Sequence, residues 1–531
     1  MKQLIQNPRA RGVQVVDLPR PALQPGALLI RTVFSVISPG TERSALRTAH
    51  DSVLATARAR PDLVRRVLDT VRREGVLAAY QKVQAKRGGL RPLGYSSAGI
   101  VTAIGPGADG HFQVGDRVVC AGAGYASHAE IVCVPTNLAA RVPDALPLET
   151  AAFATLGAVA LHGVRQAEPG LGDRFAVIGL GLIGLMTVQL LRATGARVIG
   201  FDLSPDLAER ALTMGAEVAA TGAPDAQVER ALSWSDGIGV DGVIVTATAA
   251  DDAPMLAAAG MCRERARVVA LGLVPFGLPR EIAYEKELEL RIARSYGPGR
   301  YDARFEEQGQ DYPIGYVRWT ETRNLEAFLQ LAAEGKVSPL DLVTHRFEID
   351  EAPRAYELLL AETTPRPLGV LISYPEPGAG AHEASATDRV LSHGFIAGTG
   401  RQSVPVIGAS GEVKIGVIGA GAFACSMLLP ILKKMPAVSM TTVVTAHGLT
   451  ALDAQLRFGF ERIGTDAEDV LSDPDIHLVV IATRHHLHAG LTARALQAGK
   501  HVFVEKPLAL NENELVTLEA TAAVAPGILM V

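Results

Sequence analysis

The chain has 531 residues, of which 48% are apolar and 20% charged, and its formal net charge is −5. That length is too great for one hydrophobic core and predicts three or more domains. The acidic balance argues against a nucleic-acid-binding protein, and the opening MKQLIQNPRARG has no apolar signal core. The four cysteines form no CxxC pair, which fits a reducing, cytoplasmic setting without disulfides. The longest apolar stretch, Ala151 to Val164, is too short to span a bilayer and predicts a buried helix.

The first 145 residues read as short strands and glycine turns, interrupted by a basic insert. VQVVDLP and ALLIRTVFSVIS precede ISPGTERSALR, and PLGYSSAGIVTAIGPG, FQVGDRVVC and YASHAEIVCVP follow the insert. This alternation predicts a small β-barrel-like domain. The helical insert, residues 43–91, carries 12 Lys or Arg against four Asp or Glu, a net charge of +8. It is either a solvated helix face or a basic lid that attracts an anionic substrate.

The next stretch, FAVIGLGLIGLMTVQLLRATGARVIGFD, reads as strand, glycine turn, helix and strand. Gly179, Gly181 and Gly184 give GxGxxG, and Asp202 ends the second strand 18 residues after the last glycine. In this context the glycines allow a tight turn and close approach of a diphosphate to the helix N-terminus. Asp202 can accept hydrogen bonds from both ribose hydroxyls and would repel a 2′-phosphate. The pattern therefore favours NAD over NADP.

Beyond Asp202, strands alternate with helices, which predicts a doubly wound parallel sheet. VDGVIVTATA and ARVVALGLV are the strand candidates, and a helix is expected between them over residues 251–262. Further helix and strand candidates lie at 325–334 and 369–373. We expect an α/β protein in which this sheet follows the barrel-like domain.

The order of barrel, GxGxxG, strand-ending acid, ALGLV and ELELRIARS resembles the medium-chain dehydrogenase/reductase superfamily, over roughly residues 1–372. The resemblance implies a GroES-like catalytic domain, 1–145 and 298–372, around a Rossmann NAD-binding domain, 146–297. The residues that this implies at the cofactor are Gly179, Leu180, Gly181, Leu182, Ile183, Gly184, Asp202 and Gly272.

The expected zinc ligands of that superfamily are missing. Ser38 and Pro39 stand where zinc members place a cysteine, and Tyr95 and Ser96 stand where they place His-Glu. AAFATLGA has no Cys, His or acid, and no four-cysteine lobe follows GDRVV. A catalytic zinc needs about three protein ligands. We therefore expect no zinc, and we interpret His128 as structural.

Without zinc, hydroxyl groups are the expected substitutes at the reacting oxygen. Thr41 falls where zinc members carry a hydroxyl residue at that oxygen, and Tyr95 falls at a former ligand position, so both are catalytic candidates or simply packed at the domain interface. Glu42 is expected to orient groups near the nicotinamide or to pair with Arg43. The glycine-rich loop SYGPGRYD (295–302) offers Tyr296, Arg300 and Tyr301 to substrate or cofactor, or is a surface loop.

A linker rich in Gly, Ala, Ser and Pro spans residues 373–411, and a second fingerprint follows in residues 412–531. VKIGVIGAGAFACSMLLPILKKM places GxGxxA, Gly419 to Ala424, between a strand and a helix. The next strand ends at Thr445, Ala446 and His447 without an acid, so its cofactor preference cannot be read.

This second unit, with IATRHHLHAGLTARALQAGKHVFVEKPLAL, resembles the Gfo/Idh/MocA oxidoreductases. The resemblance implies that Lys506 lies near nicotinamide and substrate and that Pro507 is cis. It adds Lys506 to the catalytic candidates and adds cofactor contacts at Gly419, Gly421, Ala422, Phe423, Glu505 and Lys506. His488 matches the family pattern, and the three histidines His485, His486 and His488 indicate a cofactor or loop role rather than a metal site. Members of this family need a C-terminal substrate domain, so a chain that stops at ILMV is expected to be truncated, or its second unit vestigial.

The leading hypothesis is a zinc-independent, NAD(P)-dependent oxidoreductase that acts on the alcohol or carbonyl of a sugar or sugar derivative, anionic if the basic insert is a lid. A nucleotide-binding sensor or scaffold without turnover is one alternative, and a quinone or enone reductase is another. A small-molecule substrate and a homo-oligomer are expected, without nucleic acid, membrane or metal.

Overall fold

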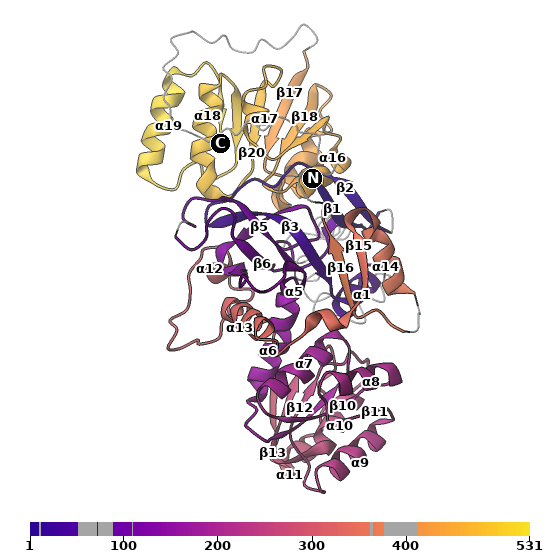
Figure 1. Ribbon diagram of the computed structural model, residues 1–531. Helices are drawn as coiled ribbons and strands as arrows, with labels where there is room; N and C mark the ends of the chain where they lie inside the picture. Colours follow the sequence, from indigo (N-terminus) through magenta and orange to yellow (C-terminus); the bar gives the residue numbers. More distant parts are fainter. Residues whose placement is uncertain are drawn as a thin grey trace.

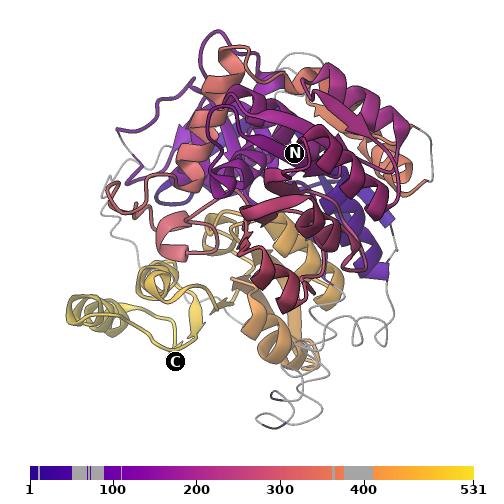
Figure 2. The same ribbon diagram turned by 90° about the horizontal axis from the view of Figure 1, so that it is seen from below.

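The computed structural model describes residues 1–9, 12–50, 69, 72, 89–108, 110–361, 365–375 and 411–531. Three folded units follow one another in space: a central unit at the N-terminus, a first Rossmann unit on one side of it and a second Rossmann unit on the other (Figure 1). The view from below places the first Rossmann unit in front and shows helix α19 (Glu512–Val524) projecting at one side (Figure 2). Within the described ranges, no helix is long and apolar enough to cross a membrane.

The central unit contains a seven-stranded sheet of order β15-β16-β3-β5-β6-β8, with β7 also paired to β3, and a three-stranded sheet of order β2-β1-β4. Strands β15 and β16 come from after the first Rossmann unit, and β16 pairs antiparallel with β3, so the chain returns to its starting domain. The strands are β1 (Lys2–Asn7), β2 (Gly12–Asp17), β3 (Ala27–Ile37), β4 (Arg91–Pro92), β5 (Ser96–Ile104), β6 (Arg117–Ala121), β7 (Ile131–Pro135), β8 (Ala139–Arg141), β15 (Val343–Glu348) and β16 (Gly369–Ser373). The helices of this unit are α1 (Pro39–His50), α12 (Ala303–Glu306), α13 (Glu321–Ala333) and α14 (Ala352–Leu360).

Helix α1 begins at Pro39, four residues before the predicted start of the insert. Proline is favoured in the first turn of a helix, and the Glu42 carboxylate accepts the backbone N–H of Ser38 at 3.0 Å, which fixes the turn before it. Most of the basic insert lies outside the described residues, so its role stays a prediction.

The first Rossmann unit is a fully parallel sheet of order β11-β10-β9-β12-β13-β14. Its strands are β9 (Arg174–Ile178), β10 (Arg197–Phe201), β11 (Val218–Ala220), β12 (Val240–Val245), β13 (Cys262–Ala270) and β14 (Glu289–Ile292). Its helices are α5 (Leu148–Ala151), α6 (Ala154–Ala167), α7 (Leu182–Ala193), α8 (Pro205–Thr213), α9 (Pro224–Trp234), α10 (Ala253–Met261) and α11 (Arg280–Glu285). The helix predicted over Ala151 to Val164 begins only at Ala154, because Ala152 and Phe153 separate it from the short helix α5.

The second Rossmann unit repeats this plan in the order β19-β18-β17-β20-β21-β22, again fully parallel. Its strands are β17 (Val413–Ile418), β18 (Val438–Val444), β19 (Arg462–Gly464), β20 (Leu478–Ile481), β21 (His501–Val504) and β22 (Leu529–Met530). Its other helices are α15 (Leu429–Leu432), α16 (Gly448–Phe458), α17 (Glu468–Leu471) and α18 (His488–Gln497). The ILMV segment forms β22 beside β21, and its Met530 is 61% exposed.

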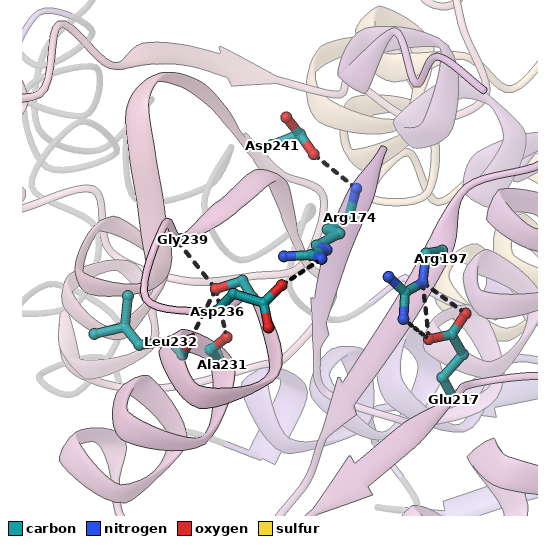
Figure 3. Close-up of polar contacts among 9 residues, drawn as sticks. Arg174, Arg197, Glu217, Ala231, Leu232, Asp236, Gly239 and Asp241 are labelled. Atoms are coloured by element: carbon teal, nitrogen blue, oxygen red, sulfur yellow. Dashed lines mark hydrogen bonds and ion pairs between the residues drawn. The ribbon is translucent and has the colours of Figure 1, made fainter. Parts of the chain in front are cut away.

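Both Rossmann sheets reverse their strand order in the middle, between β9 and β12 and between β17 and β20. In open parallel sheets, ligands bind outside the carboxyl ends of the strands at such a reversal. Ion pairs of the first unit lie at the other edge: the Arg174 guanidinium contacts Asp236 at 2.7 Å, its backbone N–H donates to Asp241, and Arg197 contacts Glu217 at 2.7 Å (Figure 3). These contacts therefore lie at the edge opposite the one where a ligand of such a sheet would bind.

Candidate active site and cofactor crevices

The turn between β9 and α7 has the geometry that a diphosphate requires. Gly179 has φ of +95°, and a Cβ there would lie 2.7 Å from the backbone nitrogen of Ala247. A Cβ at Gly184 would lie 1.9 Å from the carbonyl oxygen of Gly179, so that glycine allows the helix to approach the strand. Gly181, in contrast, has open space around its Cβ position. The space over Gly181, at the start of a helix, fits the diphosphate of a dinucleotide.

Asp202 lies beside this turn and is half-buried. Its carboxylate accepts the backbone N–H of Leu180 at 2.7 Å and that of Ser204 at 2.9 Å. A carboxylate can accept about four hydrogen bonds, so capacity remains for ribose hydroxyls. These residues fit a nicotinamide dinucleotide, which would bring a nicotinamide able to accept or donate hydride.

The other expected cofactor residues of this crevice differ in what they offer. The side chains of Leu180 and Leu182 are buried in the core and Ile183 is half-buried, so a cofactor would meet mainly their backbone. A Cβ at Gly272, which follows β13, would lie 2.0 Å from the carbonyl oxygen of Ala247. Gly272 therefore packs two loops of the carboxyl edge together.

Thr41 and Tyr95 lie together in the central unit, beside Ser38. The Ser38 hydroxyl donates to the Thr41 hydroxyl at 3.4 Å. Burial raises the pKa of the Tyr95 phenol to about 12, although hydrogen bonds to Ser38 and Thr41 lower it. Tyr95 is therefore protonated at neutral pH and can act as a hydrogen-bond donor, while Thr41 is exposed to an incoming ligand.

A network of buried polar side chains supports this hydroxyl cluster. Glu42 is 4% exposed; beyond its bond to Ser38, its carboxylate accepts from Tyr356 and lies 3.5 Å from Nε2 of His128. The Ser35 hydroxyl hydrogen-bonds Nδ1 of His128 at 2.7 Å, and it also bonds the Tyr374 phenol.

His128 also decides which residue can precede Tyr95. A Cβ at Gly94, where φ is +87°, would lie 2.7 Å from three atoms of the His128 ring. Only glycine fits there, so the ring fixes the backbone that presents Tyr95.

The predicted ligand positions do not fit a zinc ion. Ser38 and Tyr95 bring hydroxyl groups, and the Ser96 hydroxyl donates to the carbonyl oxygen of Ala152 at 2.7 Å. In the part of the chain that the structure describes, no group of three His, Cys, Asp or Glu side chains could hold a metal. All four cysteines are free and buried.

The loop over residues 295–302 is more buried than a surface loop. Tyr296 is 2% exposed, and its hydroxyl lies 3.6 Å from the Cβ position of Gly122, whose N–H donates to the Tyr95 carbonyl. Arg300 forms a buried ion pair with Glu306, so it is not a free anion clamp, whereas Tyr301 is 60% exposed.

The glycine turn of the second Rossmann unit is open to solvent. Gly419 has φ of +98°, Gly421 has free space at its Cβ position, Ala422 is exposed and Phe423 is 53% exposed. Thr445 stands at the end of β18, and its hydroxyl donates to the carbonyl oxygen of His447 at 2.7 Å.

The EKP segment of this unit follows β21. Lys506 is exposed, Glu505 is half-buried, and the peptide bond before Pro507 is cis, as the resemblance implies. Lys506 therefore lies in the second Rossmann unit, whereas Thr41 and Tyr95 lie in the central unit.

His488 is buried between two backbone carbonyl groups. Its Nδ1 lies 2.8 Å from the carbonyl oxygen of Pro507 and its Nε2 lies 3.2 Å from that of Thr483. The ring of His485 packs edge-on against it. His488 thus ties two loops together, and neither of its nitrogens is free for a metal.

Sequence reasoning missed Tyr356 and Tyr374. Tyr356 is 314 residues from Glu42, and only the return of the chain through β15 and β16 brings the two together. A buried glutamate requires a partner, but no local pattern names which tyrosine supplies it.

Two family profiles match the chain. "Zinc-binding dehydrogenase" matches residues 183–307, and "Oxidoreductase family, NAD-binding Rossmann fold" matches residues 413–531. Levoglucosan dehydrogenase of Pseudarthrobacter phenanthrenivorans is 38% identical over 110 residues, 19% of this chain and 28% of that protein. Sorbitol dehydrogenase of Bacillus subtilis is 25% identical over 297 residues, 50% of this chain and 77% of that protein.

The fold has solved counterparts as well. Alcohol dehydrogenase TADH from Thermus sp. ATN1 matches with a TM-score of 0.53 and 24% identity, over 71% of this chain and 100% of that one. The matched share of the levoglucosan dehydrogenase is 28%, so that likeness concerns a part of it. Residues 183–307 are therefore similar to the zinc-binding dehydrogenases and residues 413–531 to the NAD-binding Rossmann domain of the Gfo/Idh/MocA oxidoreductases, so the chain joins two oxidoreductase-like units.

Proposed function

We propose that this chain is an NAD-dependent oxidoreductase that transfers hydride between nicotinamide and the alcohol or carbonyl group of a sugar or sugar derivative, without a zinc ion. The observation that carries the proposal is the hydroxyl cluster of Ser38, Thr41 and Tyr95, in which Ser38 and Tyr95 stand where zinc ligands are expected. The buried Glu42 carboxylate holds this cluster in place by accepting the Ser38 N–H.

Each residue of the cluster has a definite task in this proposal. The Thr41 hydroxyl is exposed and binds the reacting oxygen of the substrate. The Tyr95 phenol donates a hydrogen bond to that oxygen as negative charge develops on it, which is the kind of stabilisation that speeds carbonyl chemistry most. Glu42 is a positioning residue, because its carboxylate holds the backbone of the cluster and faces the protein interior.

The choice of NAD and of a carbohydrate substrate has separate support. Asp202 would repel a 2′-phosphate, and no Arg or Lys stands among Leu203, Ser204 and Pro205 to bind one. Sorbitol dehydrogenase and levoglucosan dehydrogenase are named for carbohydrate substrates.

The test combines binding and turnover. Wild-type protein should bind NADH in calorimetry and reduce NAD⁺ with at least one member of a panel of sugar alcohols and anhydrosugars. Thr41→Val and Tyr95→Phe should each bind NADH normally and lose turnover. Tyr284→Phe, a change at a 70% exposed side chain of the first Rossmann unit, is the matched control and should keep both. Binding without turnover across the panel would instead support a nucleotide sensor.

A further inference from the structure

The second Rossmann unit turns its carboxyl edge toward the central unit (Figure 1). The N–H of Ala22 donates to the carbonyl oxygen of Ala446 at 3.0 Å, and the hydroxyl of Thr465 donates to that of Arg20 at 2.6 Å. Ala446 follows β18 and Thr465 follows β19. Residues Leu18–Ala22, called the cover segment here, therefore cross the ends of both strands.

The contact is tight at its centre. A Cβ at Gly448 would lie 2.8 Å from the carbonyl oxygen of Pro19 and 3.1 Å from Cδ of that proline. Leu449 is 8% exposed and packs in one apolar cluster with Leu18 and Ile5. No layer of ligand atoms fits between Gly448 and the cover segment while they are in contact.

The two Rossmann units share one backbone frame at this place. The N–H of Gly179 donates to Phe201 at 2.7 Å, and that of Gly419 donates to Val444 at 2.8 Å. The residue after each strand bonds the neighbouring strand in turn, with Asp202 donating to Ala220 in the first unit. In the second unit, Thr445 donates in the same way to Gly464. Thr445 is thus the counterpart of Asp202.

The shared frame locates the cover segment on the cofactor crevice. The residue at the Asp202 position is the one that meets the adenine ribose in a Rossmann dinucleotide site. In the first unit the following residue, Leu203, is 83% exposed. In the second unit Ala446 and Gly448 are in contact with the cover segment, whereas the diphosphate turn at Gly421 and Phe423 stays open. The contact therefore falls on the adenosine end only.

We infer that the cover segment closes the adenosine end of the second dinucleotide crevice, so that docking of the central unit and binding of a nicotinamide dinucleotide to the second unit exclude each other. A ligand that binds only the undocked state shifts the chain toward that state. The inference concerns binding and does not depend on turnover.

The interface has features of a contact that can open. Two ion pairs flank it: Arg484 with Glu307 at 3.1 Å and Arg9 with Asp453 at 3.2 Å, and the Arg484 side chain is 74% exposed. A solvent-exposed pair such as Arg484–Glu307 contributes little to stability. A half-open pocket of about 260 Å³ also lies at the interface and is lined by Gln3, Tyr125, Ser127, His447 and Thr450, among others.

The experiment requires variants that abolish nucleotide binding at one site and leave the other site intact. Gly181→Val and Gly421→Val place a side chain in the open space of the first and second diphosphate turn, where a Cβ meets no neighbouring atom within 4 Å. The Gly181→Val protein then reports on the second site by NADH fluorescence. Adding Leu18→Asp, which puts a charge into the apolar cluster under Leu449, undocks the units. Val114→Asp, at a 65% exposed position of the central unit, is the charge control.

We expect Leu18→Asp to tighten NADH binding at the second site at least about tenfold and to expand the particle in small-angle scattering. Adding Gly421→Val should remove the gain. Gly448→Val loosens the same contact from the other side and provides the test if Leu18→Asp does not fold. Unchanged or weaker binding in an expanded particle would overturn the inference, because the central unit would then complete the adenosine site through the interface pocket. An unexpanded particle in both variants would overturn the assigned contact itself.

Discussion

At the scale of single residues, Tyr95 is the side chain on which the proposed chemistry depends most. Tyr95→Phe removes the donor and leaves the ring, so kcat should fall about 100-fold or more, within the range of positioned proton donors, while KM for substrate changes little. Because its pKa is raised to about 12, the phenol stays protonated across the working range, and the pH–rate profile should show no ionisation from Tyr95 below about pH 11. Steady-state kinetics across pH checks both expectations. Full activity in Tyr95→Phe would mean that another group donates the hydrogen bond to the reacting oxygen of the substrate.

Asp202 offers a second test at this scale. Asp202→Ala removes the carboxylate that we expect to bind the ribose and also its bonds to the Leu180 and Ser204 N–H groups. NADH binding to the first site should weaken about tenfold or more, and discrimination against NADPH should fall, since the negative charge is gone. Calorimetry with both nucleotides in the Gly421→Val background measures it. Unchanged affinity for both nucleotides would show that Asp202 does not meet the ribose.

Glu321 predicts a pH dependence of stability. The side chain is fully buried in the first turn of α13, and burial, together with the charge of Glu306, raises its pKa to about 9. The unfolded carboxyl titrates near 4.5, so from about pH 4.5 to 9 the native state holds a proton that the unfolded state has released. The free energy of unfolding therefore falls as pH rises through that window, by at most about 1.4 kcal/mol per pH unit.

Glu321→Gln should remove this contribution and flatten the slope between pH 5 and pH 8. Urea unfolding at several pH values measures it, with Glu357→Gln, at an exposed position of α14, as the control that keeps the wild-type slope. A wild-type slope in Glu321→Gln would mean that Glu321 is ionised in the folded protein.

Sequence alone located Thr41 and Tyr95 by their positions in recognisable motifs, and the structure places them together. It could not reveal what holds them, because the partners of Glu42 come from distant segments. His128 was expected to be structural, but its contact with Gly94 depends on packing that no motif encodes.

At the scale of elements, two glycines of the β9–α7 turn have different roles. Gly184 is needed for stability, and Gly181 is needed for nucleotide binding. Gly184→Ala should destabilise the protein by about 1–3 kcal/mol or more, because its Cβ would overlap the carbonyl oxygen of Gly179. Gly181→Val should cost less than about 1 kcal/mol, since φ there is −66°, and yet should abolish NADH binding at the first site. Urea unfolding and fluorescence titration check the pair. Equal loss of stability in both variants would contradict these roles.

The Rossmann elements were predictable because strand, glycine turn and helix are local patterns. The strand at Gly369–Ser373 was predictable as well, since it is a continuous apolar run. The break between α5 and α6 was not, because the stretch is uniformly apolar and tertiary packing decides where the helix is interrupted. The start of α1 was also predicted too late, at residue 43 instead of Pro39. Its N-terminus is held by the Glu42 carboxylate, which lies inside the helix and accepts the Ser38 N–H.

At the scale of the whole molecule, the two proposed dinucleotide crevices have different surroundings. The first lies in the unit that adjoins the hydroxyl cluster, and the second meets the cover segment at one end. The two units could be recognised separately from sequence, but the contact between them could not. Gly448 fits against Pro19 because of shape, and neither residue belongs to a motif.

The measurement that tests the central claim most directly is hydride transfer by protein freed of metal. Enzyme treated with a chelator, with its zinc content measured by atomic emission, is assayed for NADH formation with the active sugar alcohol beside the Tyr95→Phe protein. We predict full activity at less than about 0.1 zinc per chain and loss of activity only in Tyr95→Phe. Activity that disappears with the metal and returns with one zinc per chain would contradict the account.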